Sequence, residues 1–391
     1  MCFDFDNITE RKNTDSIKYD FATQRGMPEG LLPLWVADMD FPAPPCVTQA
    51  LEEKSRHGIF GYSESGDAYF EAVRNWFDSN FGWSPKRGWL VKTPGVVYAI
   101  CTAIRALTQE GDAVLIQQPV YYPFTESILA NRRKLAVNQL VYTQGNYQID
   151  FEDFENQIVS HGVKLFILCS PHNPVGRVWT KDELLQLGIL CHRYGVVVIS
   201  DEIHADFVFP GHVHTVFASV NPLFEDFTIT CTAPSKTFNL AGLQNSNIFI
   251  KNADIRNAFR DEIKKSGYSQ LNIMGMVACR AAYEQGGEWL NELRAYLTQN
   301  LAFLRNFLAQ RLPQIRLVEP QGTYLVWLDC KALGLGDKDL DRFVIHKAGL
   351  WLDGGTMFGA GGQGFQRVNI ACPRRILEKA LLQLEQAVKA K

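Results

Sequence analysis

The stretch Val196-Val-Val-Ile-Ser-Asp-Glu-Ile-His, residues 196–204, indicates the fold class of this chain. Its first four residues are apolar and β-branched without alternation, which is typical of a parallel strand that is covered on both faces. Asp201 follows at the carboxyl end of this predicted strand, where open α/β sheets bind their ligands. A helix cap is the alternative role for an acid there. A buried carboxylate needs a partner, and a protonated ring nitrogen would be one.

Further β-rich apolar runs occur at 113–116, 165–169, 228–232 and 247–250. Helical patterns lie between some of these runs, such as residues 181–194. Thr180 precedes this helix as its predicted N-cap, and Glu183 at the third helical position completes a capping box. Strands that alternate with helices predict an α/β sheet with helices on both faces.

The ends of the chain have a different texture. Residues 1–45 contain several prolines, which predicts an extended arm. The arm also carries apolar residues such as Trp35, Met39 and Phe41, so we expect it to pack on a neighbouring domain or subunit. Residues 46–287 then form the large α/β domain. Residues 288–391 contain two amphipathic helix patterns, 288–312 and 375–390, around a strand at 324–328, which predicts a smaller α+β domain.

Composition excludes several classes of protein. The 391 residues include 39 Lys and Arg against 42 Asp and Glu, a net charge of −3, so there is no electrostatic footprint for nucleic acid or an anionic membrane. No run of 18 apolar residues predicts a membrane span. The nine cysteines form no CxxC pair, which argues against a disulfide framework and a metal site. The charged start of the chain lacks a signal-peptide pattern, so we expect a cytoplasmic protein that acts on small molecules.

The most informative chemical motif is Thr232-Ala-Pro-Ser-Lys-Thr-Phe-Asn-Leu-Ala-Gly-Leu, residues 232–243. A lone lysine is more often a solvated surface group. Lys236, however, comes directly after a predicted strand, and Pro234, Phe238 and Leu240 surround it. Partial burial lowers the pKa of an amine and makes it a nucleophile, and such lysines form Schiff bases with carbonyl compounds.

Three other motifs follow strand ends or open a helix. Asn173 lies between two prolines in residues 170–176, although a plain turn is an alternative there. Thr93-Pro-Gly-Val-Val offers the N–H groups of Val96 and Val97 as a generic phosphate cradle. Residues 118–124 offer an aromatic face, although tyrosines near prolines often only pack. Together these motifs match the groups of pyridoxal 5'-phosphate (PLP). The amine suits its aldehyde, the carboxylate its ring nitrogen, the amide its ring oxygen, the helix N-terminus its phosphate and the aromatic side chain its ring face.

With these motifs the chain resembles the fold-type I PLP-dependent enzymes, the aspartate aminotransferase superfamily, and within it the MalY/PatB group of cystathionine β-lyases and cysteine C–S lyases. The resemblance implies a mostly parallel seven-stranded sheet plus a smaller α+β domain. The matching segments span the chain almost end to end: Leu34-Trp-Val-Ala-Asp-Met-Asp-Phe, Phe60-Gly-Tyr, Thr93-Pro-Gly-Val-Val, Pro119-Val-Tyr-Tyr, His172-Asn-Pro-Val-Gly, Ser200-Asp-Glu-Ile-His, Ser235-Lys-Thr-Phe-Asn, Gln321-Gly-Thr-Tyr-Leu and Cys372-Pro-Arg.

The resemblance also implies roles for single residues. Lys236 would hold PLP covalently and act as the catalytic base, and Asp201 would pair with the ring nitrogen. The other expected cofactor contacts are Asn173 on the ring oxygen, a catalytic Tyr121 on the ring face, the Val96 and Val97 amides and Ser235 on the phosphate, His204, and Tyr62 from the second subunit of a homodimer with a shared active site. Arg374 would clamp the substrate carboxylate, with Asn173, Tyr122 and Ala37 completing the substrate pocket.

Two departures from the aminotransferases point to the lyases. His204 stands where aminotransferases commonly have tyrosine, and Gln244 stands where they commonly have a phosphate-binding arginine. We therefore expect α,β-elimination on L-cystathionine, L-cysteine or another cysteine S-conjugate, giving pyruvate, ammonia and a thiol. The alternatives are a class I/II aminotransferase and, from another class, a PLP-bound regulatory protein with little catalysis.

Overall fold

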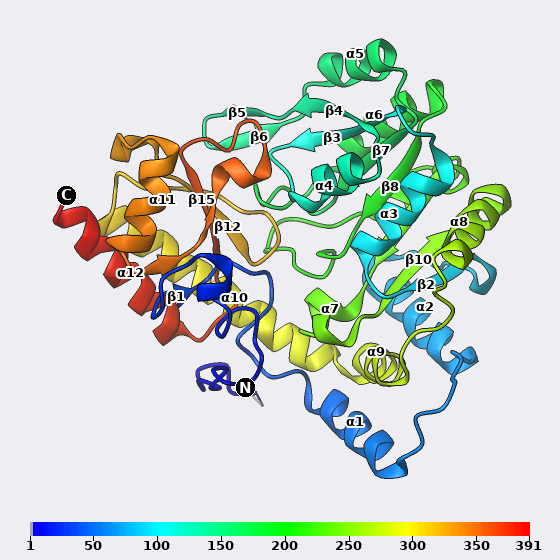
Figure 1. The fold of residues 1–391 in the computed structure, drawn as a ribbon, viewed down its shortest axis with the longest axis horizontal. Helices are drawn as coiled ribbons and strands as arrows, with labels where there is room; N and C mark the ends of the chain where they lie inside the picture. The colour runs from blue at the N-terminus through cyan, green and yellow to red at the C-terminus, as the bar shows by residue number, and fades with distance from the viewer. Residues whose placement is uncertain (1–2) are drawn as a thin grey trace.

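A seven-stranded sheet forms the centre of the larger part of the molecule in the computed structural model, which describes residues 3–391 (Figure 1). The strands lie in the order β2 (Leu90–Thr93), β10 (Ser246–Ile250), β9 (Thr228–Thr232), β8 (Val197–Asp201), β7 (Leu165–Cys169), β3 (Ala113–Gln118) and β4 (Lys134–Gln139). Strand β10 is antiparallel to both of its neighbours, and the other adjacent pairs are parallel. The predicted mostly parallel, seven-stranded sheet is confirmed.

Both faces of this sheet are covered by helices, which explains the unbroken apolar runs of its strands. In β7, Leu165 and Ile167 pack on the side of α3 (Val96–Leu107), α4 (Pro123–Ala130) and α8 (Ala253–Lys265). Phe166 and Leu168 point the opposite way, toward α5 (Phe151–His161) and α6 (Lys181–Arg193). Successive side chains of a strand alternate between faces, so a strand buried on both sides needs apolar residues throughout. Helix α6 begins at the predicted capping box.

A second, antiparallel sheet is built from the C-terminal part of the chain, in the order β11 (Arg316–Val318), β12 (Leu325–Asp329), β15 (Phe365–Asn369) and β14 (Asp353–Gly354). The long helix α10 (Gly287–Arg311) runs from the large sheet toward this second sheet, where α12 (Arg374–Lys389) lies beside it (Figure 1). The other α-helices are α1 (Pro45–His57), α2 (Asp67–Phe81), α7 (Pro234–Thr237), α9 (Ile273–Gln285) and α11 (Asp337–His346), and β5 (Val141–Thr143) and β6 (Asn146–Gln148) form a hairpin.

The N-terminal arm packs on the part of the molecule that contains the second sheet. Its strand β1 (Leu32–Pro33) pairs in parallel with β13 (Leu350–Trp351). The ring of Trp35 stacks on that of Trp351 at a centroid distance of 4.5 Å. Met39 is fully buried a few residues later. The arm thereby brings Ala37 and Met39 against Lys236 and Asn239, which follow β9 of the large sheet.

Residues 3–391 contain neither a helix suited to span a membrane nor a group of side chains suited to bind a metal ion. None of the helices there is both long and apolar enough to cross a membrane. None of the groupings of His, Cys, Asp and Glu side chains in that range has the geometry to hold a metal ion.

Candidate active site

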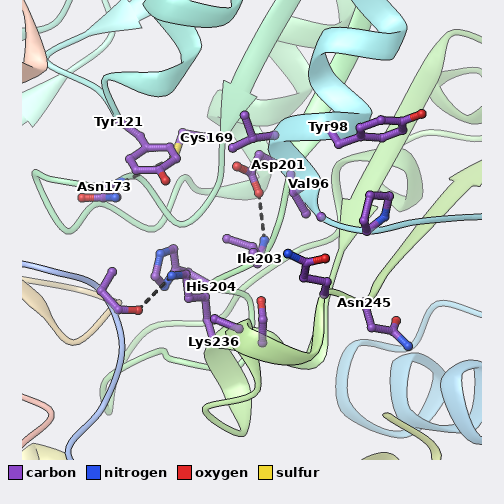
Figure 2. Close-up of a pocket in the computed structure, with 17 residues that line it drawn as sticks. Val96, Tyr98, Tyr121, Cys169, Asn173, Asp201, Ile203, His204, Lys236 and Asn245 are labelled. Atoms are coloured by element: carbon purple, nitrogen blue, oxygen red, sulfur yellow. Dashed lines mark hydrogen bonds between the residues drawn. The ribbon is translucent and has the colours of Figure 1, made fainter. Parts of the chain in front are cut away.

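A cavity lies at the carboxyl ends of β7, β8 and β9, which is the place where an open α/β sheet binds ligands. Asn173 follows β7, Asp201 is the last residue of β8, and Lys236 lies in the short helix α7 that follows β9. The three side chains line the same cavity, with Tyr121 beside Asn173 (Figure 2). The structure therefore brings together the residues that three separate motifs predicted.

Lys236 is held with its amine inside the cavity. The chain leaves β9 in an extended conformation at Ala233, and Pro234 starts helix α7, so the lysine stands one turn beyond the strand. Its Nζ donates a hydrogen bond to the backbone carbonyl of Ala37, at 2.8 Å (Figure 2). Burial lowers the pKa of Lys236 to about 8, although the nearby charge of Asp38 opposes the shift. An appreciable share of the amine is therefore neutral, and able to act as a nucleophile or base, near neutral pH.

Asp201 is a buried carboxyl that lacks a close cation. It is 6% exposed, and its Oδ1 accepts a hydrogen bond from the N–H of Ile203 at 3.1 Å. Burial raises the pKa of Asp201 to about 7, against the lowering effect of that hydrogen bond and of the Lys236 charge. A positively charged ligand group beside Asp201 would restore its ionised form, as a protonated ring nitrogen does.

Asn173 connects the two sides of the cavity. Its Oδ1 accepts a hydrogen bond from Arg367 Nη1 at 3.0 Å, and its backbone carbonyl accepts one from the N–H of Tyr121 at 3.0 Å. The ring of Tyr121 therefore stands beside the amide of Asn173 (Figure 2). Burial raises the pKa of Tyr121, so its phenol stays neutral at physiological pH. The pair offers a polar group and a flat aromatic face to a ring-shaped ligand.

The opposite end of the cavity is suited to an anion. Helix α3 begins at Val96 after Gly95, and no side chain caps its first turn. The N–H groups of Val96 and Val97 have no acceptor within the helix, and the helix dipole favours negative charge at this end. Ser235 and Gln244 line the same cavity.

His204 also lines the cavity, as a neutral side chain. It is 4% exposed, and its ring lies 5.7 Å from that of Tyr324. Burial lowers the pKa of His204 to about 3, with a further contribution from the Lys236 charge. Its Nδ1 has no hydrogen-bond partner in the structure, so this buried nitrogen can serve a ligand.

Three predicted residues lie elsewhere. Tyr62 is fully exposed and takes no part in this chain's cavity. Tyr122 is partly buried behind Tyr121, at a ring distance of 5.5 Å, without lining the cavity. Arg374 does not reach the cavity either. Its Nε donates to Asn300 Oδ1 at 2.7 Å, and its guanidinium lies over the ring of Phe303. The role of Arg374 as a clamp for a substrate carboxylate stays a prediction, and the structure places this side chain against α10, apart from the residues that line the cavity.

A second arginine, Arg367, was not predicted from the sequence and bonds to the cavity residue Asn173. It lies in the middle of β15, is 2% exposed, and also donates to the carbonyl of Trp35 at 2.7 Å and pairs with Asp353. The signal for it was present in the sequence, since Phe365-Gln-Arg-Val-Asn places a guanidinium inside a strand pattern. Charged side chains are almost never buried unless they are paired or functional.

Comparison with known proteins identifies similar chains along the full length. Residues 29–384 match the sequence pattern of the aminotransferase class I and II family. The chain is 42% identical to cystathionine beta-lyase PatB of Bacillus subtilis, over 98% of this chain and 99% of that protein. It is similar to the crystal structure of a PLP-bound putative aminotransferase from Clostridium difficile, with a TM-score of 0.97 and 41% identity, covering 99% and 100% of the two chains. A PLP-bound C-S lyase from Staphylococcus hominis gives a TM-score of 0.93 and 33% identity, covering 99% and 98%.

Proposed function

We infer the function of this chain from one premise: it belongs to the aminotransferase class I and II family. Within that family it is a PLP-dependent carbon–sulfur β-lyase, which releases pyruvate, ammonia and a thiol from L-cystathionine, L-cysteine or another cysteine S-conjugate. The observation that carries this conclusion is the cavity in which Lys236, Asp201 and Asn173 converge from three strand ends.

The cavity residues fit PLP on three independent counts. The buried carboxyl of Asp201 lacks a cation, the first turn of α3 lacks a cap, and the amine of Lys236 has a lowered pKa. Lys236 would hold PLP covalently, and Asp201 would pair with its ring nitrogen. The other contacts that we propose are Asn173 to the ring oxygen, Tyr121 on the ring face, the Val96 and Val97 amides and Ser235 to the phosphate, and His204 beside the ring.

PLP supplies an electron-withdrawing ring for the negative charge that develops at the substrate Cα. The residues of this chain supply the proton transfer and the orientation. Once the amine of the substrate has replaced that of Lys236 on PLP, the freed neutral amine of Lys236 would take the Cα proton, and the carboxylate of Asp201 would keep the ring nitrogen protonated. The thiolate would then leave the β-carbon, which is favourable because a thiol has a pKa of about 8.5. Water then hydrolyses the remaining three-carbon fragment to pyruvate and ammonia.

We propose that Arg367 binds the substrate carboxylate. A guanidinium holds a carboxylate with two parallel hydrogen bonds, which aligns the substrate as well as binding it. Arg367 bonds Asn173 at the cavity wall, and Trp35 and Asp353 fix its other nitrogen. Ala37 would border the substrate inside the cavity, and Tyr122 would contact its sulfur side from beyond Tyr121.

An assay of product formation without any keto acid tests the proposed reaction. The purified protein, loaded with PLP, is incubated separately with L-cystathionine, L-cystine and L-cysteine. We expect steady release of pyruvate and thiol in equal amounts. A requirement for an added keto acid would instead identify an aminotransferase, and protein that binds PLP without turning over any of the substrates would favour a regulatory role.

We also propose that the active unit is a homodimer. Residues 58–66 form an extended segment on which Ile59, Phe60 and Tyr62 are largely exposed to solvent. Exposed apolar side chains grouped on one segment favour a protein contact. A second copy that covers this segment would bring Tyr62 to the phosphate end of the neighbouring cavity. Sedimentation of the purified protein as a monomer at micromolar concentration would contradict this proposal.

Two coarser assignments complete the proposal. We propose the divisions 1–45, 46–287 and 288–391 as arm, large PLP-binding domain and small domain. The second boundary then falls in the first turn of α10. The eight cysteines among the described residues are free thiols, which supports a reducing compartment such as the cytoplasm.

A further inference from the structure

Two acids of the arm, Asp38 and Asp40, have no role in the chemistry described above. They belong to Leu34-Trp-Val-Ala-Asp-Met-Asp-Phe, which runs along the cavity wall. The carbonyl of Ala37, directly before Asp38, accepts hydrogen bonds from Lys236 Nζ at 2.8 Å and from the hydroxyl of Tyr324 at 3.0 Å. The Ala37 carbonyl of the arm thus contacts the Lys236 amine, which takes the Cα proton in the proposed reaction.

A cluster of charges from the first 20 residues holds the two acids. Arg11 bridges them, with Nη2 at 2.6 Å from Asp38 Oδ2 and Nη1 at 2.8 Å from Asp40 Oδ1. Lys18, which is 1% exposed, lies 2.8 Å from Asp40 Oδ2 and 3.7 Å from Asp38 Oδ1. Tyr19 donates its hydroxyl to Asp40 at 3.2 Å. A buried ion cluster of this kind adds little net stability, because desolvation offsets the attraction, but it fixes the positions of its members.

The same segment is tied to the turn that follows Lys236. Asn239 accepts the N–H of Met39 at 3.0 Å and donates to the carbonyls of Met39 and Phe41 at 3.0 and 2.9 Å. From the second sheet, Asn369 donates to the carbonyls of Val36 at 2.7 Å and of Asp38 at 2.6 Å. The peptide group that faces Lys236 is therefore fixed from the arm, from α7 and from β15.

We propose that Asp38, held in place by Arg11 and Lys18, is a positioning residue that sets the proton affinity of Lys236. The proposal rests on the proposed function, in which Lys236 takes the Cα proton. The carbonyl of Ala37 favours the protonated form of the lysine because a hydrogen bond from a charged donor is roughly twice as strong as a neutral one. The carboxylate of Asp38, in the next residue along the arm, favours the same form through its negative charge. Asp38 thereby opposes the effect of burial on the pKa of Lys236.

Other charged or titratable groups near Lys236 also influence its proton affinity, so they must stay unchanged in any variant that tests the role of Asp38. Arg367 lowers its proton affinity and Asp201 raises it. The remaining groups lining this part of the cavity or bonded to the Ala37 carbonyl are His204, Tyr121, Cys169 and Tyr324. None of these is changed in the experiment.

The test compares two substitutions with opposite electrostatic signs. Asp38→Asn removes a negative charge and leaves Arg11 and Lys18 in excess. Arg11→Gln removes a positive charge but keeps a hydrogen-bond donor near the acids. The readout is a pH titration of the visible absorbance of the PLP-loaded enzyme. In this form the Lys236 nitrogen is bonded to PLP, and the absorbance reports whether that nitrogen carries a proton. We expect the midpoint to fall by roughly one pH unit in Asp38→Asn and to rise in Arg11→Gln.

A matched control separates this role from a structural one. Glu262→Gln breaks another partly buried ion pair, with Arg105 at 2.7 Å, between α3 and α8 and away from the cavity. It should lower the melting temperature without moving the midpoint. The acid limb of kcat/KM should move with the absorbance midpoint in the two arm variants. Asp38→Glu, which keeps the charge, should restore most of the wild-type titration and serves if Asp38→Asn does not fold.

Unchanged midpoints in folded, PLP-loaded Asp38→Asn and Arg11→Gln would overturn the proposal, as would shifts of the same sign. The absorbance titration needs no substrate. Failure of this inference therefore shows in the midpoint, whereas failure of the proposed function shows as a lack of pyruvate release from the wild-type enzyme.

Discussion

The two walls of the cavity are built in different ways. Asn173, Asp201 and Lys236 stand at or just after the ends of neighbouring strands, so the backbone ladder of the large sheet sets their spacing. The facing wall includes Ala37 of the arm, and Arg367 of the second sheet supports it from behind by its bonds to Asn173 and to the carbonyl of Trp35. Side-chain hydrogen bonds to backbone carbonyls join these parts. In the mechanism that we propose, the strand-end wall performs the chemistry, and the facing wall, which we call the assembled wall, aligns the substrate and tunes the proton affinity of Lys236.

The largest effect is expected at the strand-end wall, from Lys236→Ala. Loss of the base and of the covalent attachment should lower pyruvate release by roughly 10⁴-fold or more. The visible absorbance of lysine-bound PLP should vanish. Lys134→Ala, which changes an exposed lysine at the start of β4, is the control and should behave like the wild type. Pyruvate release near the wild-type rate from Lys236→Ala would remove the basis of the proposed mechanism.

The next effect concerns Asp201 and the stability of the PLP-free protein. The pKa of Asp201 is about 7 in the fold, above its ordinary value of 3.8, so the folded state binds more protons than the unfolded state between these values. Stability due to Asp201 must then fall as the pH rises from 4 to 7. Relative to Asp201→Asn, the free energy of unfolding should drop by about 3 kcal/mol over this range.

The Asp201 measurement uses urea unfolding of both PLP-free proteins at several pH values. Taking the difference cancels the buried histidines His172 and His204, whose pKa values are lowered and whose contributions have the opposite sign. PLP should reverse the trend by supplying the missing cation. A difference that stays flat with pH would mean that Asp201 is ionised in the empty cavity.

A smaller effect is expected at the assembled wall, from Arg367→Lys. Lysine keeps the charge but cannot form the two parallel bonds, so KM for the amino acid should rise by about 10- to 100-fold, with a smaller change in kcat. Arg374→Lys is the matched control, and its kinetics should stay close to the wild type because Arg374 contacts α10. If Arg374→Lys raised KM and Arg367→Lys did not, the assignment of the substrate arginine would be reversed.

The residues of the strand-end wall could be predicted from local sequence patterns, whereas those of the assembled wall could not. The strand-end residues could be found from local patterns, because each lies within a few positions of an apolar run that marks its strand. The α/β class, the capped helix α6 and the mostly parallel sheet were predictable for the same reason. The antiparallel strand β10 was predicted as a strand, but its direction was not, because direction depends on the path of the chain between strands.

The assembled wall could not be predicted in this way. Ala37 and Lys236 are 199 residues apart in sequence, and Asn173 and Arg367 are 194 apart. A local pattern does not say which of two nearby arginines, Arg367 or Arg374, will face the cavity. The difference follows from their elements, since β15 runs along the wall whereas Arg374 opens α12 against α10.

The sequence by itself determined the chemical groups at the strand ends, since burial of the apolar runs forces the next polar residues to the rim of the sheet. The tertiary structure decided that Arg367 bonds to Asn173 and that a peptide of the arm meets Lys236. Those contacts depend on how distant segments pack, and packing is a property of the whole chain that no short stretch of residues contains.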